Sequence, residues 1–305
     1  MKEKKHNHKK HNHENHIHEE QIQVRKKSMT MITLKRLSES KTAMIGLGII
    51  ILIFLVSLIG PFFCKYGVNE MIMADRCLPP SAKHWFGTDT YGRDIFVRLL
   101  YGGRYSLILG ISGSLFGLAI GVVLGLINGY IGGAFDNIFM RILDIWSAIP
   151  GTLLAVLIST VLGPGFFNTM VALSIGSVPL IIRLLRGRIL SVGHEEFLEA
   201  ATTINASPFR IMFKHMLPNV ISPVIVNTTM SVGGVILEAA ALSYIGLGIQ
   251  PPNPEWGAML SDAKNYATYY PWMLLFPGCA IALVVLCINL LGDGLRDAID
   301  PKLKK

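Results

Sequence analysis

Charged residues are scarce in this chain. Asp, Glu, Lys and Arg make up 16% of its 305 residues, whereas 51% of the residues are hydrophobic. Because soluble globular domains carry roughly 25% charged residues, this balance excludes an ordinary soluble domain. Apolar runs dominate the sequence after Thr42, and about 20 apolar residues in a helix are enough to cross a membrane. The composition therefore predicts an all-α integral membrane protein.

Catalytic motifs are missing as well. No G-K-[S/T] tripeptide occurs, so the chain cannot hold ATP with a P-loop of its own. Residues 110–113 match the G-x-S-G of intramembrane serine proteases, but such an enzyme needs a histidine in a later span. His194 and His215 fall in a polar segment instead. We therefore predict no catalytic residue and no cofactor bound by this chain, and an intramembrane protease or a channel is the least favoured alternative.

Six apolar runs are long enough to span a membrane. They cover residues 43–63, 105–131, 138–162, 167–185, 220–247 and 272–291. Lys and Arg cluster before the first run, after the fourth run and at the C-terminus, and such clusters mark cytoplasmic flanks. We therefore expect a multi-pass protein of the cell membrane with both termini cytoplasmic. The basic loop 65–104 argues against this orientation, but long translocated loops obey the rule poorly.

Histidines are concentrated near the N-terminus, in a polar stretch with too few apolar residues to form a core. They form three H-x-H pairs: His6, His8, His11, His13, His16 and His18. Imidazole nitrogens suit Ni, Zn and Cu, so residues 1–34 are expected to form a disordered cytoplasmic tail that is either a loose metal-binding tract or a solvated spacer. We divide the rest into a first span with its outer loop (35–104) and a five-helix core (105–305). The net charge of +8 fits contact with membrane lipid and not nucleic acid, because aromatic and basic residues do not interleave.

Glycines recur at every fourth position of the second run. They are Gly113, Gly117, Gly121, Gly125, Gly129 and Gly133. Ladders of small residues mark the faces where membrane helices pack closely. Because four residues overshoot one helical turn by about 40°, the ladder winds around its helix and favours a crossed neighbour. The sequence therefore predicts a tightly packed bundle.

One polar stretch interrupts the apolar runs: residues 195–219, EEFLEAATTINASPFRIMFKHMLPN. Apolar residues recur at helical spacing on each side of a break, with Phe197, Ala201 and Ile204 on one face before it and Phe209, Met212, Phe213 and Met216 after it. Asn205 suits a left-handed helix end, Ser207 an N-cap and Pro208 a first helical turn. We predict two short amphipathic helices joined by a turn, with the second ended by Pro218.

The same stretch resembles the EAA loop of ABC importer permeases, whose pattern is E-A-A-x3-G-x9-I-x-L-P. The corresponding residues are Glu199, Ala200, Ala201, Asn205, His215, Leu217 and Pro218. Asparagine replaces the glycine and tolerates the same left-handed conformation, and histidine before x-L-P-N is usual in the peptide-importer branch. The resemblance implies that a coupling loop at 188–219, with Phe209, sits in a groove of a separate ATPase subunit and passes on the motion of ATP binding and hydrolysis.

Three further motifs resemble signatures of the C-type permeases of dipeptide, oligopeptide and nickel importers. They are HWFGTDTYGRDIF at 84–96, EAAALSYIGLG at 238–248 and GDGLRD at 292–297. The likeness runs from about residue 35 to the end and implies the type I ABC importer permease fold. It also implies import of dipeptides or oligopeptides, with nickel or a metal chelate as the alternative. The implied partners are a B-type permease, two ATPases that use ATP and Mg, and an extracytoplasmic binding protein.

Charges in the outer loop and in the fifth run are candidate functional groups. The outer-loop motif contributes Gly87, Thr88, Asp89, Gly92, Arg93 and Asp94. Its charges alternate in sign within a turn bounded by glycines, so we expect them to pair with one another and fix the loop, with direct substrate contact as the alternative. Glu238 lies in the fifth run, where an unpaired carboxylate is costly. It must face the bundle interior, a pathway or a partner's cation, and both structural pairing and substrate contact stay open.

Smaller features complete the expectations. Cys64 and Cys77 share the outer loop and could form a disulfide on the outer side of the membrane. Arg141 and Asp144 are three residues apart and are expected to pair. Candidate helix kinks are Pro150, Pro179 and Pro223.

Overall fold

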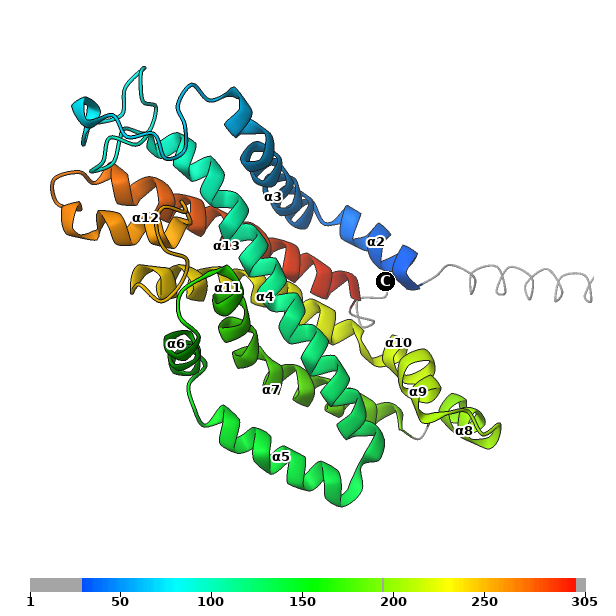
Figure 1. Cartoon of the computed structure of the whole chain (residues 1–305). Helices are drawn as coiled ribbons and strands as arrows, with labels where there is room; N and C mark the ends of the chain where they lie inside the picture. The colour runs from blue at the N-terminus through cyan, green and yellow to red at the C-terminus, as the bar shows by residue number, and fades with distance from the viewer. Residues whose placement is uncertain (1–28, 194, 300–305) are drawn as a thin grey trace, which may run out of the picture.

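The computed structural model describes residues 29–193 and 195–299. Their regular elements are helical, apart from one bridge between Thr88 and Asp94 (Figure 1). Five spans are long and apolar enough to cross a membrane, and a bent pair of helices can form a sixth. The tail histidines His6, His8, His11, His13, His16 and His18 lie outside the described residues, as does His194.

The long helices follow the predicted runs closely. They are α3 (Lys41–Ile59), extended by η1 (Gly60–Phe63), α4 (Ile95–Ile131), α7 (Phe166–Val192), α11 (Ser222–Tyr244) and α13 (Trp272–Ile299). Short helices occupy the two ends of the bundle: α2 (Met29–Glu39), η2 (Met73–Asp75), α8 (Glu196–Thr203), α9 (Pro208–Arg210), α10 (Leu217–Val220), α12 (Trp256–Ala263) and η4 (Lys264–Tyr266). A π-helical turn, η3 (Ile211–Met216), connects α9 to α10.

The third run is not one straight span. It forms α5 (Gly133–Ser147) and α6 (Gly151–Leu162), which meet at an angle of 82°. Pro150 is the N-cap of α6, where the missing N–H of proline leaves no helical bond to break. Pro179 lies inside α7, but Pro223 lies in the first turn of α11 and not at an internal kink. The helical path is nevertheless interrupted at Ile221, between α10 and α11 and directly before this turn, so bending beside Pro223 stays a prediction.

Helix α4 begins ten residues earlier than the predicted second run. The carboxylate of Asp94 caps it by accepting the N–H of Val97 at 2.9 Å. Arg104 looks like a loop charge in the sequence, yet it lies on α4 and donates to the main-chain carbonyls of Ser57 and Leu58 at 2.7 Å. The predicted boundary between residues 104 and 105 therefore falls inside α4. The grouping of the chain into a first span with its loop and a five-helix core stays a prediction.

The glycine ladder packs against two neighbours of α4. Gly117, Gly121, Gly125 and Gly129 face α7, because a Cβ added at any of them would meet α7 residues within 3.1 Å. Gly113 faces Val235 on α11 instead. In Figure 1, α4 runs obliquely across α11 and α7, as the winding of the ladder predicts. Gly133 has open space around it and a φ of +58°, so it serves the turn into α5 and not the packing.

The arrangement of α3 is set by α13. A Cβ on Gly46 would lie 2.7 Å from the carbonyl oxygen of Cys287, and a Cβ on Gly294 would lie 2.3 Å from the Cβ of Ala43. Small residues on both helices thus allow the first span to lie against the last one, at the side of the bundle opposite α5 (Figure 1).

Candidate functional site: the EAA segment and the outer cap

The EAA segment, residues 195–219, folds as two short helices with a turn between them, as predicted. Asn205 has a φ of +53°, the left-handed conformation that ends α8. Ser207 accepts the N–H of Arg210 at 3.4 Å, and Pro208 occupies the first turn of α9. The predicted stop at Pro218 is wrong. Proline there falls in the first turn of α10, where it needs no N–H, and the chain stays helical towards α11.

The inner face of the EAA segment is anchored in the bundle. Leu198, Ala201, Ile211 and Met216 are buried and share one core cluster with Leu126, Leu185 and Ile189, from the ends of α4 and α7. A displacement of this segment therefore acts directly on the ends of two long helices. Such close packing transmits movement, because protein interiors are dense and resist compression.

The outer face of the EAA segment exposes apolar side chains. Ile204 is 74% exposed and Phe209 is 69% exposed, and the rings of Phe209 and Phe213 contact each other in a tilted arrangement, with their centroids 4.5 Å apart. The prediction that Phe197, Ala201 and Ile204 share one face is wrong, since Ala201 points into the core while the other two are exposed. Leu198 and Ala201, three residues apart on α8, are the residues that pack into the core, so the buried face of this short helix is centred on them.

The remaining EAA residues lie at the rim of this surface. Glu199 is exposed, and its main-chain carbonyl accepts the hydroxyls of Thr202 and Thr203. Ala200 lies in the middle of α8. His215 and Leu217 are half-buried, whereas Pro218 is exposed.

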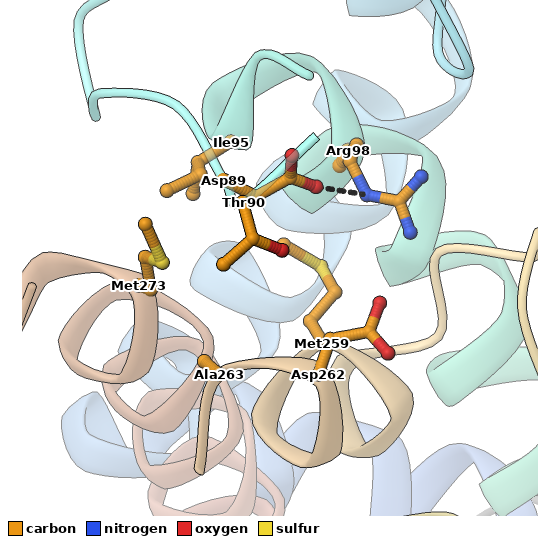
Figure 2. Close-up of a pocket in the computed structure, with 8 residues that line it drawn as sticks. All are labelled: Asp89, Thr90, Ile95, Arg98, Met259, Asp262, Ala263 and Met273. Atoms are coloured by element: carbon orange, nitrogen blue, oxygen red, sulfur yellow. Dashed lines mark ion pairs between the residues drawn. The ribbon is translucent and has the colours of Figure 1, made fainter. Parts of the chain in front are cut away.

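An outer cap, residues 64–94 together with α12, closes the other end of the bundle. Arg93 pairs with Asp89, as the charge pattern predicts, and also with Asp262 of α12 at 3.1 Å. Figure 2 shows the guanidinium of Arg98 facing Asp89, and their closest atoms are 3.9 Å apart. The cavity beside these charges measures about 20 Å³, which is room for about one water. The network therefore fixes the cap and leaves no space for cargo.

Two glycines of the outer motif are required by the backbone. Gly87 and Gly92 have φ values of +77° and +74°, a conformation that side chains with a Cβ rarely adopt. A Cβ on Gly92 would also lie 2.0 Å from the carbonyl oxygen of Ile72. Thr88 lies between them and donates its hydroxyl to the carbonyl of Asp75 while accepting the N–H of Leu78 at 2.8 Å.

His84 has a role that the sequence did not predict. This residue is fully buried, with Nδ1 at 2.8 Å from Asp94 and Nε2 at 3.5 Å from Asp75. Asp94 is thus paired with a histidine and not with Arg93, so the predicted pairing within the turn holds for Asp89 only. A hydrogen bond from Lys83 keeps the pKa of Asp75 below its ordinary value, with a smaller contribution from His84.

Glu255 was also missed, although it joins the cap to α4. It is the N-cap of α12, accepts the N–H of Ala258 at 2.9 Å and accepts the hydroxyl of Ser106 at 3.0 Å. Burial raises the pKa of this carboxyl, and its hydrogen bonds oppose that shift. A single carboxylate thus connects residues that are far apart in sequence, which no local pattern reveals.

Other predicted positions have mixed outcomes. Glu238 is half-buried on α11 and has no ion pair or hydrogen bond within residues 29–193 and 195–299. Arg141 lies 3.8 Å from Asp144 as predicted, but Arg183 comes closer, at 3.1 Å. Cys64 and Cys77 are free thiols, so the structure does not contain the suggested disulfide.

The helical bundle with its bent third span is similar to chains of known structure. Chains from two inward-facing crystal forms of the MetNI methionine ABC transporter have this fold, with a TM-score of 0.53 and 20% and 21% sequence identity. The matches cover 67% and 68% of this chain and 96% and 98% of those chains. The type I ABC importer permease fold is therefore confirmed.

The sequence itself matches a defined family. Residues 121–305 match the binding-protein-dependent transport system inner membrane component, and residues 28–80 match the N-terminal TM domain of oligopeptide transport permease C. The chain therefore belongs to the family of binding-protein-dependent transport system inner membrane components. It is a multi-pass inner-membrane transport permease of the C type, and the family has no enzymatic activity of its own.

Several named relatives span nearly the whole chain. The dipeptide transport system permease protein DppC of Alkalihalophilus pseudofirmus is 46% identical over 88% of this chain and 89% of its own length. The oligopeptide transport system permease protein OppC of Bacillus subtilis is 41% identical over 93% of both chains. The glutathione transport system permease protein GsiD of Escherichia coli O157:H7 is 43% identical over 88% of this chain and 89% of its own.

Proposed function

We propose that this chain is the permease subunit of an ATP-driven importer that moves dipeptides or oligopeptides from an extracytoplasmic binding protein into the cytoplasm. The cargo is supported by the relatives named for dipeptides and oligopeptides. A relative named for glutathione, itself a small peptide, agrees with that chemistry. Both termini and the EAA segment face the cytoplasm, as the distribution of Lys and Arg favours.

The exposed apolar face of the EAA segment is the observation that carries this proposal. Side chains such as Ile204 and Phe209 are unfavourable at a polar surface, and an exposed apolar patch there fits a protein partner. Their partner is one of two ATPase subunits, which bind ATP and Mg and receive α8 and α9 in a groove. A B-type permease supplies the other half of the pore, and the binding protein docks on the outer side.

The mechanism is alternating access, in which the bundle opens in turn to the outside and to the cytoplasm. Closure of the ATPases around ATP moves the EAA segment, whose buried face shifts the ends of α4 and α7. The break at Pro150 and the prolines inside α7 and α13, Pro179 and Pro277, are places where the bundle can bend. Glu238 faces the pore or a cation of the B-type permease, since a membrane carboxylate without a partner in its own chain needs one elsewhere.

Disulfide crosslinking in the assembled importer tests the proposed coupling role. An Ile204→Cys substitution, paired with single cysteines around the ATPase groove, is expected to give a crosslinked permease–ATPase product that changes in yield on ATP addition. Phe62→Cys is the matched control, because Phe62 is also highly exposed, at 82%, but lies on η1, which follows the first span. Absence of any product with Ile204→Cys, or labelling of that cysteine only from the outer side, would remove the coupling role.

Nickel or a metal chelate remains the alternative cargo, favoured by the histidine tail. Within the residues that the structure describes, no three His, Cys, Asp or Glu side chains gather as a metal site. Deletion of residues 2–20 is expected to leave dipeptide uptake unchanged, because a cytoplasmic tail meets ions only after passage. Uptake of radiolabelled dipeptide and accumulation of nickel are measured side by side. A loss of nickel accumulation alone would favour the metal alternative.

A further inference from the structure

Two neighbouring cavities line the side of the bundle formed by α11 and α13. The first, about 560 Å³, opens among α2, the end of α7, α10 and the end of α13. The second, about 250 Å³, lies deeper, between α3, α4, α11 and α13. Ile225 on α11 borders both cavities, so they lie next to each other along α11, the first at the EAA end of the bundle and the second among its apolar helices; we call the pair the crevice.

The two cavities differ sharply in polarity. The first and larger cavity, which we call the outer cavity, is bordered by Arg188, Asn219 and Ser222. We call the second the inner cavity. No carboxylate lies within ion-pair distance of Arg188 in the part of the chain that the structure describes. A free guanidinium at a membrane surface attracts phosphate, with which it forms bidentate hydrogen bonds.

The inner cavity is bordered by aliphatic residues except for three that carry hydroxyls: Ser114, Thr228 and Thr229. Ser114 is 1% exposed and Thr228 is 5% exposed, and neither hydroxyl has a hydrogen-bond partner within the described residues. Thr229 already donates to the carbonyl of Ile225 at 2.9 Å. Because the hydroxyl oxygens of Ser114 and Thr228 are covered by protein atoms, they add almost no polar surface to the cavity, and its wall suits an apolar chain.

We infer that this crevice binds one anionic glycerophospholipid from the cytoplasmic leaflet. Its phosphate pairs with Arg188, and one acyl chain fills the aliphatic inner cavity. Thr228, which borders the inner cavity, lies six residues beyond Ser222, about 9 Å further along α11, so an acyl chain enters the inner cavity from a head group beside Ser222. The leaflet assignment rests on the proposed orientation of the EAA segment.

Other occupants fit less well. A peptide would bury its main-chain N–H and C=O groups among side chains that offer almost no partners, which is unfavourable. A helix from a second subunit has a diameter of about 10–12 Å with its side chains, more than an inner cavity of about 250 Å³ accommodates. A lipid matches the change in polarity between the two cavities, because it has a charged head group and an apolar chain. Its head group would contact Pro218 and Asn219, the last residues of the EAA segment.

The test uses the assembled importer with the full chain, reconstituted in nanodiscs of phosphatidylcholine and phosphatidylglycerol. Bound phosphatidylglycerol is counted by native mass spectrometry after detergent exchange. Arg188→Gln is expected to lower its retention about five- to tenfold, and Arg188→Lys to keep most of it. Arg141→Gln is the control, because Arg141 is highly exposed on α5 and borders neither cavity.

Phosphatidylglycerol with a diazirine in its acyl chain probes the inner cavity. We expect crosslinks on Leu115 of α4 and Val232 of α11, and we expect Ile225→Trp to abolish them by closing the junction. Leu286→Trp on the exposed face of α13 is the control. Unchanged retention in Arg188→Gln, or crosslinks confined to exposed faces, would overturn the lipid site. Co-purification of the ATPase subunits is scored in every variant, so that a failure of the coupling proposal is seen separately.

Discussion

Replacing Gly121 with leucine is expected to prevent the protein from folding to its native bundle. An added Cβ would lie 2.6 Å from Cγ2 and 2.7 Å from Cβ of Ile181 on α7, closer than side-chain atoms tolerate. The backbone of α4 must then move away from α7 along their shared interface. One inserted methylene in a packed core typically costs about 1–3 kcal/mol, and leucine adds several heavy atoms at a point of close helix contact. That loss approaches the whole stability of a typical domain, about 5–15 kcal/mol.

The measurement is the yield of monodisperse permease in mild detergent and the temperature at which it aggregates. Gly48→Leu is the matched control, because Gly48 lies on the first span and a Cβ there meets nothing within 4 Å. It replaces glycine by a better helix former and is expected to leave the yield unchanged or improved. Normal yield and thermal stability for Gly121→Leu would show that α4 and α7 do not pack as the structure describes.

The glycine ladder shows what the sequence could and could not reveal. Its period correctly predicted a close and crossed contact, because backbone approach requires small residues at fixed spacing. The identity of the neighbour could not be predicted, since glycines carry no side chain that selects one helix over another. Gly113 packs against α11 while Gly117 packs against α7, and only the three-dimensional path of α4 separates the two.

Helix ends were the least predictable part of the fold. Helix α4 was expected to begin at residue 105 because Arg98 and Arg104 interrupt the apolar pattern. In the structure both arginines are satisfied by oxygen atoms of residues that precede the helix, such as Val68 and Ser57. Long-range hydrogen bonds of this kind allow a charged side chain to lie on a helix in the bundle, but they leave no local signal. The third run has the same difficulty: it is apolar throughout, so its sequence does not reveal that α5 and α6 meet at 82° near Pro150.

Sequence motifs located the outer cap and the EAA segment, but they predicted only some of the contacts that their residues make. Alternating charge predicted the pair of Arg93 with Asp89, but His84 was passed over, because a lone histidine in a sequence gives no sign of two carboxylates folded around it. In the EAA segment, helical spacing found the two helices correctly. It could not tell which apolar residues anchor the segment and which remain exposed, since both kinds recur with the same period.

The division between these two faces supports the second large prediction, which concerns Phe209. Its truncation to alanine is expected to reduce ATP-dependent uptake by about thirtyfold, while the subunit still inserts and folds. The reason is that Phe209 is 69% exposed and contributes little to the core, whereas a central aromatic side chain in a protein interface commonly contributes about 2 kcal/mol or more to binding. Glu199→Arg should act in the same direction, because Glu199 is exposed on the same segment.

Uptake and ATP hydrolysis must be measured together to separate coupling from folding. In a coupling variant the ATPase activity of the reconstituted importer no longer responds to the loaded binding protein, yet the permease elutes normally and retains its thermal stability. Ala201→Leu is the contrasting variant, because Ala201 is buried in the cluster that joins α8 to α4 and α7, and its enlargement should lower stability as well as transport. Uptake at the normal rate in both Phe209→Ala and Glu199→Arg would mean that the exposed face of the EAA segment is not where the ATPase acts.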